Sequence, residues 1–327
     1  MVTYHDTDPL FARHPDNPIL HAGMWPYPVH SVFNAGATRL KNGDTLLMCR
    51  CESRAGHSHI TAARSVDGVF NWAIDPEPTF VPNYGNHPED LWGIEDCRIT
   101  LMDELGKYAV VYAAYGIDGA AVALALTEDF RSFERIGVIA HAWDKDAALL
   151  PRRINGKFVL FHRPMVGDSG HIWMSVSDDL KSWVDRRPVL RARQGGWWDA
   201  NKIGLSPPPI ETEEGWLMIY HGVRQHASGS IYRLGLALFD LERPDVCLRR
   251  GREWVMGPRE PYELLGDVPY VVFPCGTTVG DDGDTLNVYY GAADTCIGLA
   301  TASIKELLAW LKDNPSDDEP LVYRPTF

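Results

Sequence analysis

The sequence predicts an all-β protein, a five-bladed β-propeller with a short C-terminal helix. The first observation behind this prediction is a loose repeat that returns five times, at spacings of roughly 50 to 70 residues. The second is a tight-turn segment after the first run of every copy. The third is that no long helical pattern separates the copies, which excludes a parallel βαβ architecture. We expect a single propeller domain over residues 1–327.

Each copy begins with a short run that starts polar and turns apolar or small. The five runs are 33–40 (FNAGATRL), 95–102 (EDCRITLM), 145–154 (KDAALLPRRI), 201–210 (NKIGLSPPPI) and 273–280 (FPCGTTVG). The turns that follow read KNGDT, DELGK, INGK, TEEGW and DDGDT. Gly, Asn and Asp are the residues that tight hairpin connections require, so each run is predicted to be the first strand of a hairpin.

Two further strands complete each copy. The second strands are the β-rich runs TLLMCRCES, YAVVYAAYG, FVLFHRP, WLMIYHGV and LNVYYGAAD. The third strands are the runs of small alternating residues HITAARS, AVALALT, IWMSVSD, RLGLALFD and IGLATAS. Radial repetition of such meanders leaves no long sheet edge bare. A pair of β-sandwiches is the alternative fold; it explains the many short strands but not the repeat.

Both ends of the chain depart from the repeat. Residues 1–32 form an N-terminal extension with NPIL and WPYPVH, and they either complete the last blade or line the mouth of the propeller. A helix is predicted over about 303–313, because Ser303 and Glu306 have the spacing of a capping box. Its apolar stripe consists of Ile304, Leu307, Leu308 and Leu311.

The composition of the chain limits the kinds of binding partner that it can have. Lys and Arg total 31 against 44 for Asp and Glu, so the formal charge of −13 argues against a nucleic-acid partner. No stretch approaches a membrane span or a signal peptide, and we expect a cytoplasmic protein. Six cysteines without C-x-x-C spacing predict free thiols rather than a metal site. The oligomeric state stays open, and the helix that carries Trp310 is one candidate interface for a homo-oligomer.

Hairpin geometry brings distant polar residues to one mouth, because the start of a first strand and the end of a second strand share an edge. First-strand starts contribute Asn34, Glu95, Asp96, Lys145, Asp146, Asn201 and Lys202. Second-strand ends contribute Arg50, Glu52, Arg163, His221 and Asp294. A single charged residue at a strand end is usually just solvated, but recurrence in five copies indicates a site.

The cations at this mouth suggest an anion ligand such as phosphate or sulfate, and we expect them to outnumber the carboxylates. The competing interpretation is structural: Arg50 would pair with Glu52 or Asp96, and Arg163 with Asp168. Aromatic residues near these positions fit the stacking of sugar rings. They are Trp92, Trp197, Trp198, Tyr115, Tyr220 and Tyr232.

A family resemblance then follows from a long succession of motifs. In chain order they are NPIL, FNAGA, SHITAARSVDGVFNW, WGIEDCRI, KDAALLP, FHRP, NKIGLSPPPI, WLMIYHGV, YRLGLALFDL, PREPYE, DVPYVVFPCG and YYGAAD. Their number and order resemble glycoside hydrolase family 130, the mannoside phosphorylases and their hydrolytic relatives. The resemblance covers nearly the whole chain.

The resemblance implies a propeller whose axial pocket binds a β-mannosyl residue and inorganic phosphate as co-substrate, with no further cofactor and no metal. Inverting phosphorolysis would give α-mannose 1-phosphate. By position, Asp96 matches the general acid. The phosphate-contacting positions are matched by Lys145, Arg163, Lys202 and His221. The mannosyl unit would be held by Asn34, Arg50, Asp146, Tyr232 and Asp294.

Two positions depart from the family pattern, since Cys97 stands where Pro is frequent and Lys145 stands where some members carry Arg. Neither change removes a functional group. The chemistry agrees with the resemblance, because a glycosidase that uses water needs two carboxylates whereas phosphate is already a nucleophile. Cations that place the phosphate can then replace the second carboxylate.

Two other functions remain open at this point. One is a β-mannoside hydrolase on the same fold, whose base the sequence does not place, although Glu52 and Asp146 lie within the predicted mouth. The other is a non-catalytic sugar-binding propeller, because a fold does not determine a function. The linkage, β-1,2 or β-1,4, and the acceptor sugar depend on loops that the sequence does not resolve.

Overall fold

The computed structural model describes residues 8, 10–140, 143–167 and 169–316, and nearly all of their regular structure is β. The strands hydrogen-bond in three sheets of five, eight and ten strands. The all-β class predicted from the sequence is therefore confirmed.

Five antiparallel meanders follow one another along the chain, numbered here from the first to the fifth. The first meander is β3 (Ser31–Arg39), β4 (Thr45–Glu52), β5 (Ser58–Ser65) and β6 (Ala73–Ile74). The second is β7 (Gly93–Met102), β8 (Lys107–Gly116), β9 (Gly119–Thr127) and β10 (Glu134–Ala140). The third is β11 (Asp144–Leu149), β12 (Phe158–Val166), β14 (Ile172–Ser177) and β15 (Val184–Leu190).

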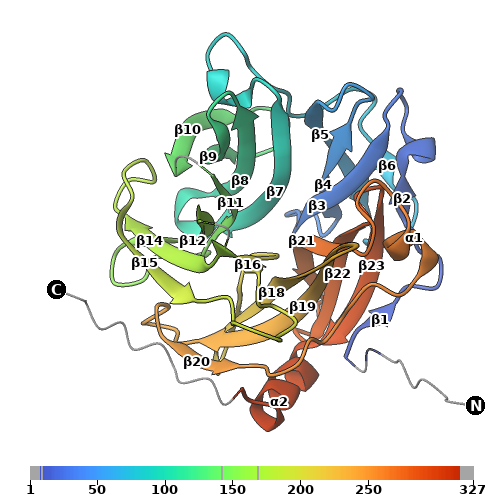
Figure 1. Cartoon of the computed structure of the whole chain (residues 1–327). Coiled ribbons are helices and arrows are strands. Elements are labelled where there is room, and N and C mark those ends of the chain that lie inside the picture. Colours follow the sequence, from blue (N-terminus) through green and yellow to red (C-terminus); the bar gives the residue numbers. More distant parts are fainter. Residues whose placement is uncertain (1–7, 9, 141–142, 168, 317–327) are drawn as a thin grey trace, which may run out of the picture.

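The last two meanders are built in the same way. The fourth is β16 (Lys202–Leu205), β18 (Gly215–His226), β19 (Gly229–Phe239) and β20 (Cys247–Arg250), with β17 (Ile210–Thr212) beside β18. The fifth is β21 (Val272–Val279), β22 (Thr285–Ala292) and β23 (Cys296–Ser303). Figure 1 shows the five meanders in sequence around the molecule, with β3, β7, β11, β16 and β21 toward the middle of the view.

Short parallel contacts merge neighbouring meanders into the larger sheets. The first and second meanders join where Ser58 pairs with Gly93. The third and fourth join through β13 (Ser169–Gly170), where Gly170 pairs with Lys202. Each contact involves the first residue of a first strand, Gly93 of β7 or Lys202 of β16, and leaves each meander antiparallel within itself.

The hydrophobic core is divided among the interfaces between meanders. Five large clusters of buried side chains each join two consecutive meanders, and one of them joins the fifth to the first. Because side chains alternate along a strand, one strand supplies both of its interfaces. The pairs that represent the five interfaces in order are Leu46 with Tyr112, Leu124 with Leu160, Phe161 with Tyr220, Leu236 with Tyr290, and Tyr289 with Leu47.

The N-terminal extension adds to the fifth meander. Strand β1 (Ala12–Arg13) and strand β2 (Leu20–His21) both pair antiparallel with β23. Of the two roles left open for residues 1–32, the described part completes the last sheet. Residues from opposite ends of the chain therefore share one sheet.

Helical structure is brief. Helix α2 spans Ile304–Asp313 as predicted, and Ser303 Oγ accepts a hydrogen bond from Glu306 N (3.2 Å) at its start. Trp310 is half-buried and packs on Gly251 of its own chain. The remaining helical turns are α1 (Pro261–Leu264), η1 (Ala22–Met24), η2 (Pro88–Asp90) and η3 (Asp103–Leu105). No helix in the described part of the chain has the length and apolar character needed to span a bilayer.

First strands of neighbouring meanders approach so closely that glycine is required. A Cβ atom on Gly36 would lie 2.5 Å from Cys97 O, between the first and second meanders. A Cβ atom on Gly276 would lie 2.2 Å from Ala37 N, between the fifth and first meanders. Real Cβ atoms do not come this close to backbone atoms, so these strands are packed backbone to backbone.

Gly276→Ala should therefore lower the free energy of unfolding by about 1–3 kcal/mol, because the added methyl group forces the fifth and first meanders apart. Thermal melting monitored by circular dichroism measures this effect. Gly85→Ala is the matched control, because a Cβ at Gly85 meets nothing within 4 Å. Equal melting temperatures for the two variants would contradict the close packing of the fifth and first meanders at Gly276.

Candidate active site

A cavity of about 460 Å³ opens among the first strands. It brings together all ten residues for which the sequence predicts a role. Fifteen residues line it: Asn34, Arg50, Glu95, Asp96, Tyr115, Lys145, Asp146, Arg163, Lys202, His221, Tyr232, Val268, Val271, Phe273 and Asp294. They come from all five meanders, so no single repeat forms the site.

Three of the polar residues are placed by the same backbone device. Asn34, Asp96 and Asp146 have φ values of 46°, 50° and 51°, in the left-handed region. Each lies where the pairing register of a first strand shifts, in β3, β7 and β11. A β-bulge of this kind redirects a side chain, and Asn and Asp tolerate left-handed backbone better than most residues. The repeated Asn or Asp at this position thus has a structural cause.

Asp96 is held by neighbours from the first meander. Its Oδ1 accepts hydrogen bonds from Asn34 Nδ2 (2.9 Å) and Arg50 NH1 (3.1 Å). Burial acts to raise the pKa of Asp96, but Arg50, Arg98 and Lys145 outweigh burial and keep this pKa below its ordinary value. In the free site, the Asp96 carboxyl is therefore ionised at neutral pH.

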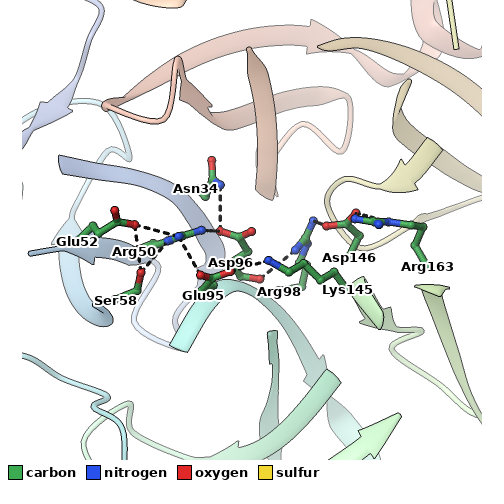
Figure 2. Close-up of polar contacts among 10 residues, drawn as sticks. All are labelled: Asn34, Arg50, Glu52, Ser58, Glu95, Asp96, Arg98, Lys145, Asp146 and Arg163. Atoms are coloured by element: carbon green, nitrogen blue, oxygen red, sulfur yellow. Dashed lines mark hydrogen bonds and ion pairs between the residues drawn. The ribbon is translucent and has the colours of Figure 1, made fainter. Parts of the chain in front are cut away.

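A chain of ion pairs runs along one side of the cavity, as Figure 2 shows. Arg50 NH2 contacts Glu52 Oε2 and Glu95 Oε1, both at 3.0 Å. Glu95 reaches Lys145 Nζ through its other oxygen (2.8 Å). Burial acts to lower the pKa of Lys145, but Glu95 and Asp96 raise it above its ordinary value. Glu95 therefore holds two cations of the cavity in place.

A second group of charges surrounds Asp146. Its Oδ2 accepts from Arg163 Nε (3.0 Å) and Arg163 NH2 (2.7 Å), and its Oδ1 accepts from Arg98 NH2 (3.4 Å). Burial acts to raise the pKa of Asp146, but the charges of Arg163 and Arg98 and the hydrogen bond with His221 hold it well below its ordinary value. Asp146 is thus a buried carboxylate that is fixed by its cationic neighbours.

His221 is a neutral member of this group. Its Nε2 lies 3.4 Å from Asp146 Oδ2, and its Nδ1 lies 3.3 Å from Ser206 Oγ. Burial lowers the pKa of His221 despite the nearby Asp146. A Cβ on Gly204 would lie 2.4 Å from Asp146 Oδ2 and 2.5 Å from His221 Cε1, so glycine is needed there.

Lys202 differs from the other cations. Its ammonium lies 5.5 Å from the centre of the Tyr232 ring. Within the described part of the chain, no hydrogen bond or ion pair reaches Lys202 Nζ. The cavity therefore presents a cation that no carboxylate neutralises.

One expectation about charge is wrong, and the competing structural interpretation is confirmed in part. The cations do not outnumber the carboxylates, because the lining residues include four Lys or Arg side chains and four Asp or Glu side chains. Arg50 pairs with Glu52 and Asp96, as the structural interpretation proposed, but Arg163 pairs with Asp146. The alternative partner Asp168 lies outside the described residues. A buried charge is stabilised by a partner of opposite charge, and among the described residues Asp146 is the carboxylate that contacts Arg163.

Comparison with known proteins decides the family. A family model described as beta-1,4-mannooligosaccharide phosphorylase matches residues 13–313, which is most of the chain. The chain belongs to glycoside hydrolase family 130. Within this family, a 1,2-beta-oligomannan phosphorylase of Thermoanaerobacter sp. is 37% identical over 288 residues, covering 85% of this chain and 91% of the relative.

Two other members of family 130 extend the comparison. A beta-1,4-mannooligosaccharide phosphorylase of Ruminococcus albus is 31% identical over 322 residues, covering 95% of this chain and 93% of the relative. The solved beta-1,2-mannobiose phosphorylase of Listeria innocua, in complex with beta-1,2-mannobiose, has a TM-score of 0.83 at 30% identity. That match covers 93% of this chain and 99% of the solved chain.

Sequence reasoning missed part of this family 130 cavity. The sequence placed Glu95 at the mouth without a role, although it bridges two cations. The apolar wall formed by Val268, Val271 and Phe273 was not predicted, because these residues precede or begin a strand and show no periodic signal. Among the described residues, no group of three His, Cys, Asp or Glu is arranged to hold a metal ion.

The predicted aromatic residues are divided among several places. Tyr115 and Tyr232 line the cavity, and Trp92 packs edge-on against Tyr115 (5.2 Å between ring centres). Trp197 and Trp198 line a different hollow of about 720 Å³. Tyr220 is buried and donates a hydrogen bond to Asp199 (3.0 Å). Only part of the expected aromatic set can therefore contact a ligand in the cavity.

Asp146→Asn should destabilise the fold at pH 7 by about 3–5 kcal/mol, because Arg163 and Arg98 lose their shared anion. Because folding lowers the pKa of Asp146, its ionised carboxylate stabilises the fold at pH values above the pKa that Asp146 has in the unfolded chain. This contribution to stability is lost as pH falls. Melting temperatures of wild type and variant should therefore converge in acid. Asp281→Asn, which removes a 91% exposed partner of Arg39, should change the melting temperature little.

Proposed function

We propose that this member of family 130 is an inverting β-mannoside phosphorylase. It transfers a mannosyl unit from a β-mannoside to inorganic phosphate and releases α-mannose 1-phosphate. Relatives over nearly the whole chain carry the names of β-1,2- and β-1,4-mannoside phosphorylases, which supports this class of reaction. The substrates are β-1,2- or β-1,4-linked manno-oligosaccharides or mannosyl-glucose.

The observation that carries the proposal is the unpaired Lys202 in the same cavity as Arg163. A Cβ atom added to Gly170 would lie 2.7 Å from Arg163 Cδ and 3.4 Å from Lys202 Cβ. The two cationic side chains therefore start close to each other, next to Gly170. Phosphate is bound well by cations held in fixed positions. Lys202 and Arg163, with His221 and Lys145, form the phosphate site of this proposal.

The reaction needs one proton and one new bond. A phosphate oxygen bonds to C1 of the mannosyl unit, and the bond from C1 to the leaving sugar oxygen breaks with inversion. The proton on the Asp96 carboxyl ends on that leaving oxygen. Because Asp96 is ionised in the free site, it must take up this proton when substrates bind, and a phosphate anion in the cavity raises its pKa in that direction.

Neither carboxylate that the sequence offered as a hydrolytic base is free to activate water. Hydrolysis needs a carboxylate that is free to activate water. Asp146 is instead bonded to Arg163, and Glu52 is bonded to Arg50. Both groups that the sequence offered as a hydrolytic base are thus held by cations. Asn34, Arg50, Asp146, Tyr232 and Asp294 remain the proposed contacts of the mannosyl unit.

The proposal includes a five-bladed propeller formed by residues 1–327 as one domain. Five meanders in chain order and five core clusters between consecutive meanders, including the fifth and first, support it. Six free cysteines support a cytoplasmic location.

Release of the mannosyl unit from β-1,2- or β-1,4-mannobiose should require inorganic phosphate. The product should be mannose 1-phosphate, measured by anion-exchange chromatography with and without phosphate. Equal amounts of free mannose in phosphate-free buffer would refute phosphorolysis and favour the hydrolase.

Lys202→Ala should raise the apparent KM for phosphate about 10- to 100-fold, because one charged hydrogen bond is lost. The KM for the mannoside should change much less. Initial rates over a matrix of the two substrate concentrations separate these constants. Lys181→Ala, an exposed lysine outside the cavity, is the control. A constant KM for phosphate in the Lys202 variant would place the anion elsewhere.

Asp96→Asn should slow the chemical step by about 10²–10⁴ while the protein stays folded, because the amide keeps the shape but cannot supply the proton. An aryl β-mannoside with a good leaving group needs little protonation and should recover much of the lost rate. The kcat values for both substrates and the melting temperature are measured on one preparation. Normal turnover by the folded variant would remove Asp96 from the mechanism.

A further inference from the structure

Carboxylates outnumber cations on the side of the cavity that the first and second meanders form together with Lys145. Glu52, Glu95 and Asp96 all contact the single guanidinium of Arg50, at 3.0, 3.0 and 3.1 Å. Lys145 supplies one further cation, to Glu95. Three carboxylates thus share two cations, and Figure 2 shows these contacts as one connected group.

Asp294 adds a fourth carboxyl to this side. It lines the same cavity and follows β22 with a left-handed φ of 52°. In the described part of the chain, no hydrogen bond or ion pair reaches its carboxyl. Its surroundings include the apolar wall, since Val268 N donates to Ala293 O (3.2 Å) and Ala293 N donates to Val271 O (3.1 Å). Asp294 is therefore a partly buried carboxyl with neither a cation nor a donor of its own.

The contacts of the other charged groups around the cavity do not involve Asp294. Arg98 and Arg163 both contact Asp146, and Lys202 lies over Tyr232. On the loop before β21, Asp267 pairs with His30 (2.9 Å). Ionising Asp294 would add a negative charge to a cavity in which Glu52, Glu95 and Asp96 already oppose it and Arg50 favours it. Partly buried like charges of this kind cannot all ionise together without a large cost in free energy.

We propose that Asp294 keeps its proton in the free enzyme and enters the reaction as a neutral carboxyl that donates a hydrogen bond to a hydroxyl group of the bound mannoside. Burial, reinforced by Asp96, Glu52 and Glu95 against the opposing effect of Arg50, raises the pKa of Asp294 to about 7. Below about pH 7, Asp96 and Asp294 therefore have opposite protonation states in one cavity, the first ionised and the second neutral. This inference rests on the proposed function for its substrate but not for the protonation state itself.

The catalytic test is the pH dependence of kcat/KM for the mannoside at saturating phosphate. In wild type, the fall of kcat/KM with pH should become steeper above about pH 7, by up to about tenfold per pH unit, as the donor is lost. Asp294→Asn keeps two N–H donors and cannot ionise. It should lower kcat/KM less than about tenfold at pH 6. The fall that remains above pH 7 should come from the proton that Asp96 must take up, so its slope should be shallower than in wild type by up to about tenfold per pH unit. Asp294→Ala has no donor and should lie at least about tenfold below the Asn variant.

The structural test is the melting temperature between pH 5 and pH 8. A group whose pKa is raised on folding stabilises the fold below its unfolded pKa, and that stability is lost as pH rises through the folded pKa. The melting temperature of Asp294→Asn minus that of wild type should therefore increase from pH 5 to pH 8. Asp118→Asn removes the same charge from an exposed turn, and its difference from wild type should stay constant.

The outcomes separate this inference from the proposed function. If kcat/KM of wild type rises through pH 7 and Asp294→Asn is as impaired as Asp294→Ala, the carboxyl acts as an ionised acceptor and the inference is wrong. A constant melting-temperature difference for Asp294→Asn would also overturn it. Phosphate-independent release of mannose by wild type would instead refute the phosphorylase, and the melting experiment would still decide the state of Asp294.

Discussion

The geometry of the site depends on the hydrogen bonds made by the buried guanidinium of Arg98. Arg98 is 2% exposed, and its nitrogen atoms donate to Asp96 O (3.0 Å), Ser206 O (3.0 Å) and Leu205 O (3.1 Å). It also contacts Asp146 and lies over the ring of Phe273 (5.4 Å). A buried charge is tolerated only when its donors are satisfied, so this one side chain fixes parts of four meanders relative to one another.

The cavity lies where β-bulges interrupt the regular pairing of the first strands, close to Arg98. Bulges at Asn34, Asp96 and Asp146 redirect the side chains, and glycines at 36 and 276 allow the strands to approach closely. A left-handed backbone costs free energy of roughly 1 kcal/mol or more at a residue other than glycine. The packing of the meanders supplies that energy, and the result is a set of functional groups on rigid strands rather than on loops.

The charges in the cavity are arranged before any ligand arrives. Arg50, Lys145 and Arg163 are held by carboxylates, whereas Lys202 is not. Fixed cations do not have to reorganise when an anionic nucleophile binds, which is the physical basis of electrostatic catalysis. The same crowding pushes Asp96 and Asp294 toward opposite protonation states, so two identical side chains have different chemistry.

Much of this protein follows from local pattern. The hairpin turns, the alternation of the strands and the capping box at Ser303 predicted the β meanders and α2, because those signals act within a few residues. The repeated position of Asn34, Asp96 and Asp146 also indicated a shared mouth. The family resemblance then assigned roles to ten residues, and all ten line the cavity.

The pairing of charges could not be read in the same way. The competing interpretation named Asp168 as the partner of Arg163 and did not name Asp146, which contacts it, and the expected excess of cations is absent. The neutrality of His221 and the opposite protonation states of Asp96 and Asp294 depend on burial and on neighbours from other meanders. The sequence by itself determined which residues can meet at the centre. Only the tertiary structure decided which charges neutralise one another, because Coulomb energies depend on distances across the meanders and not on spacing along the chain.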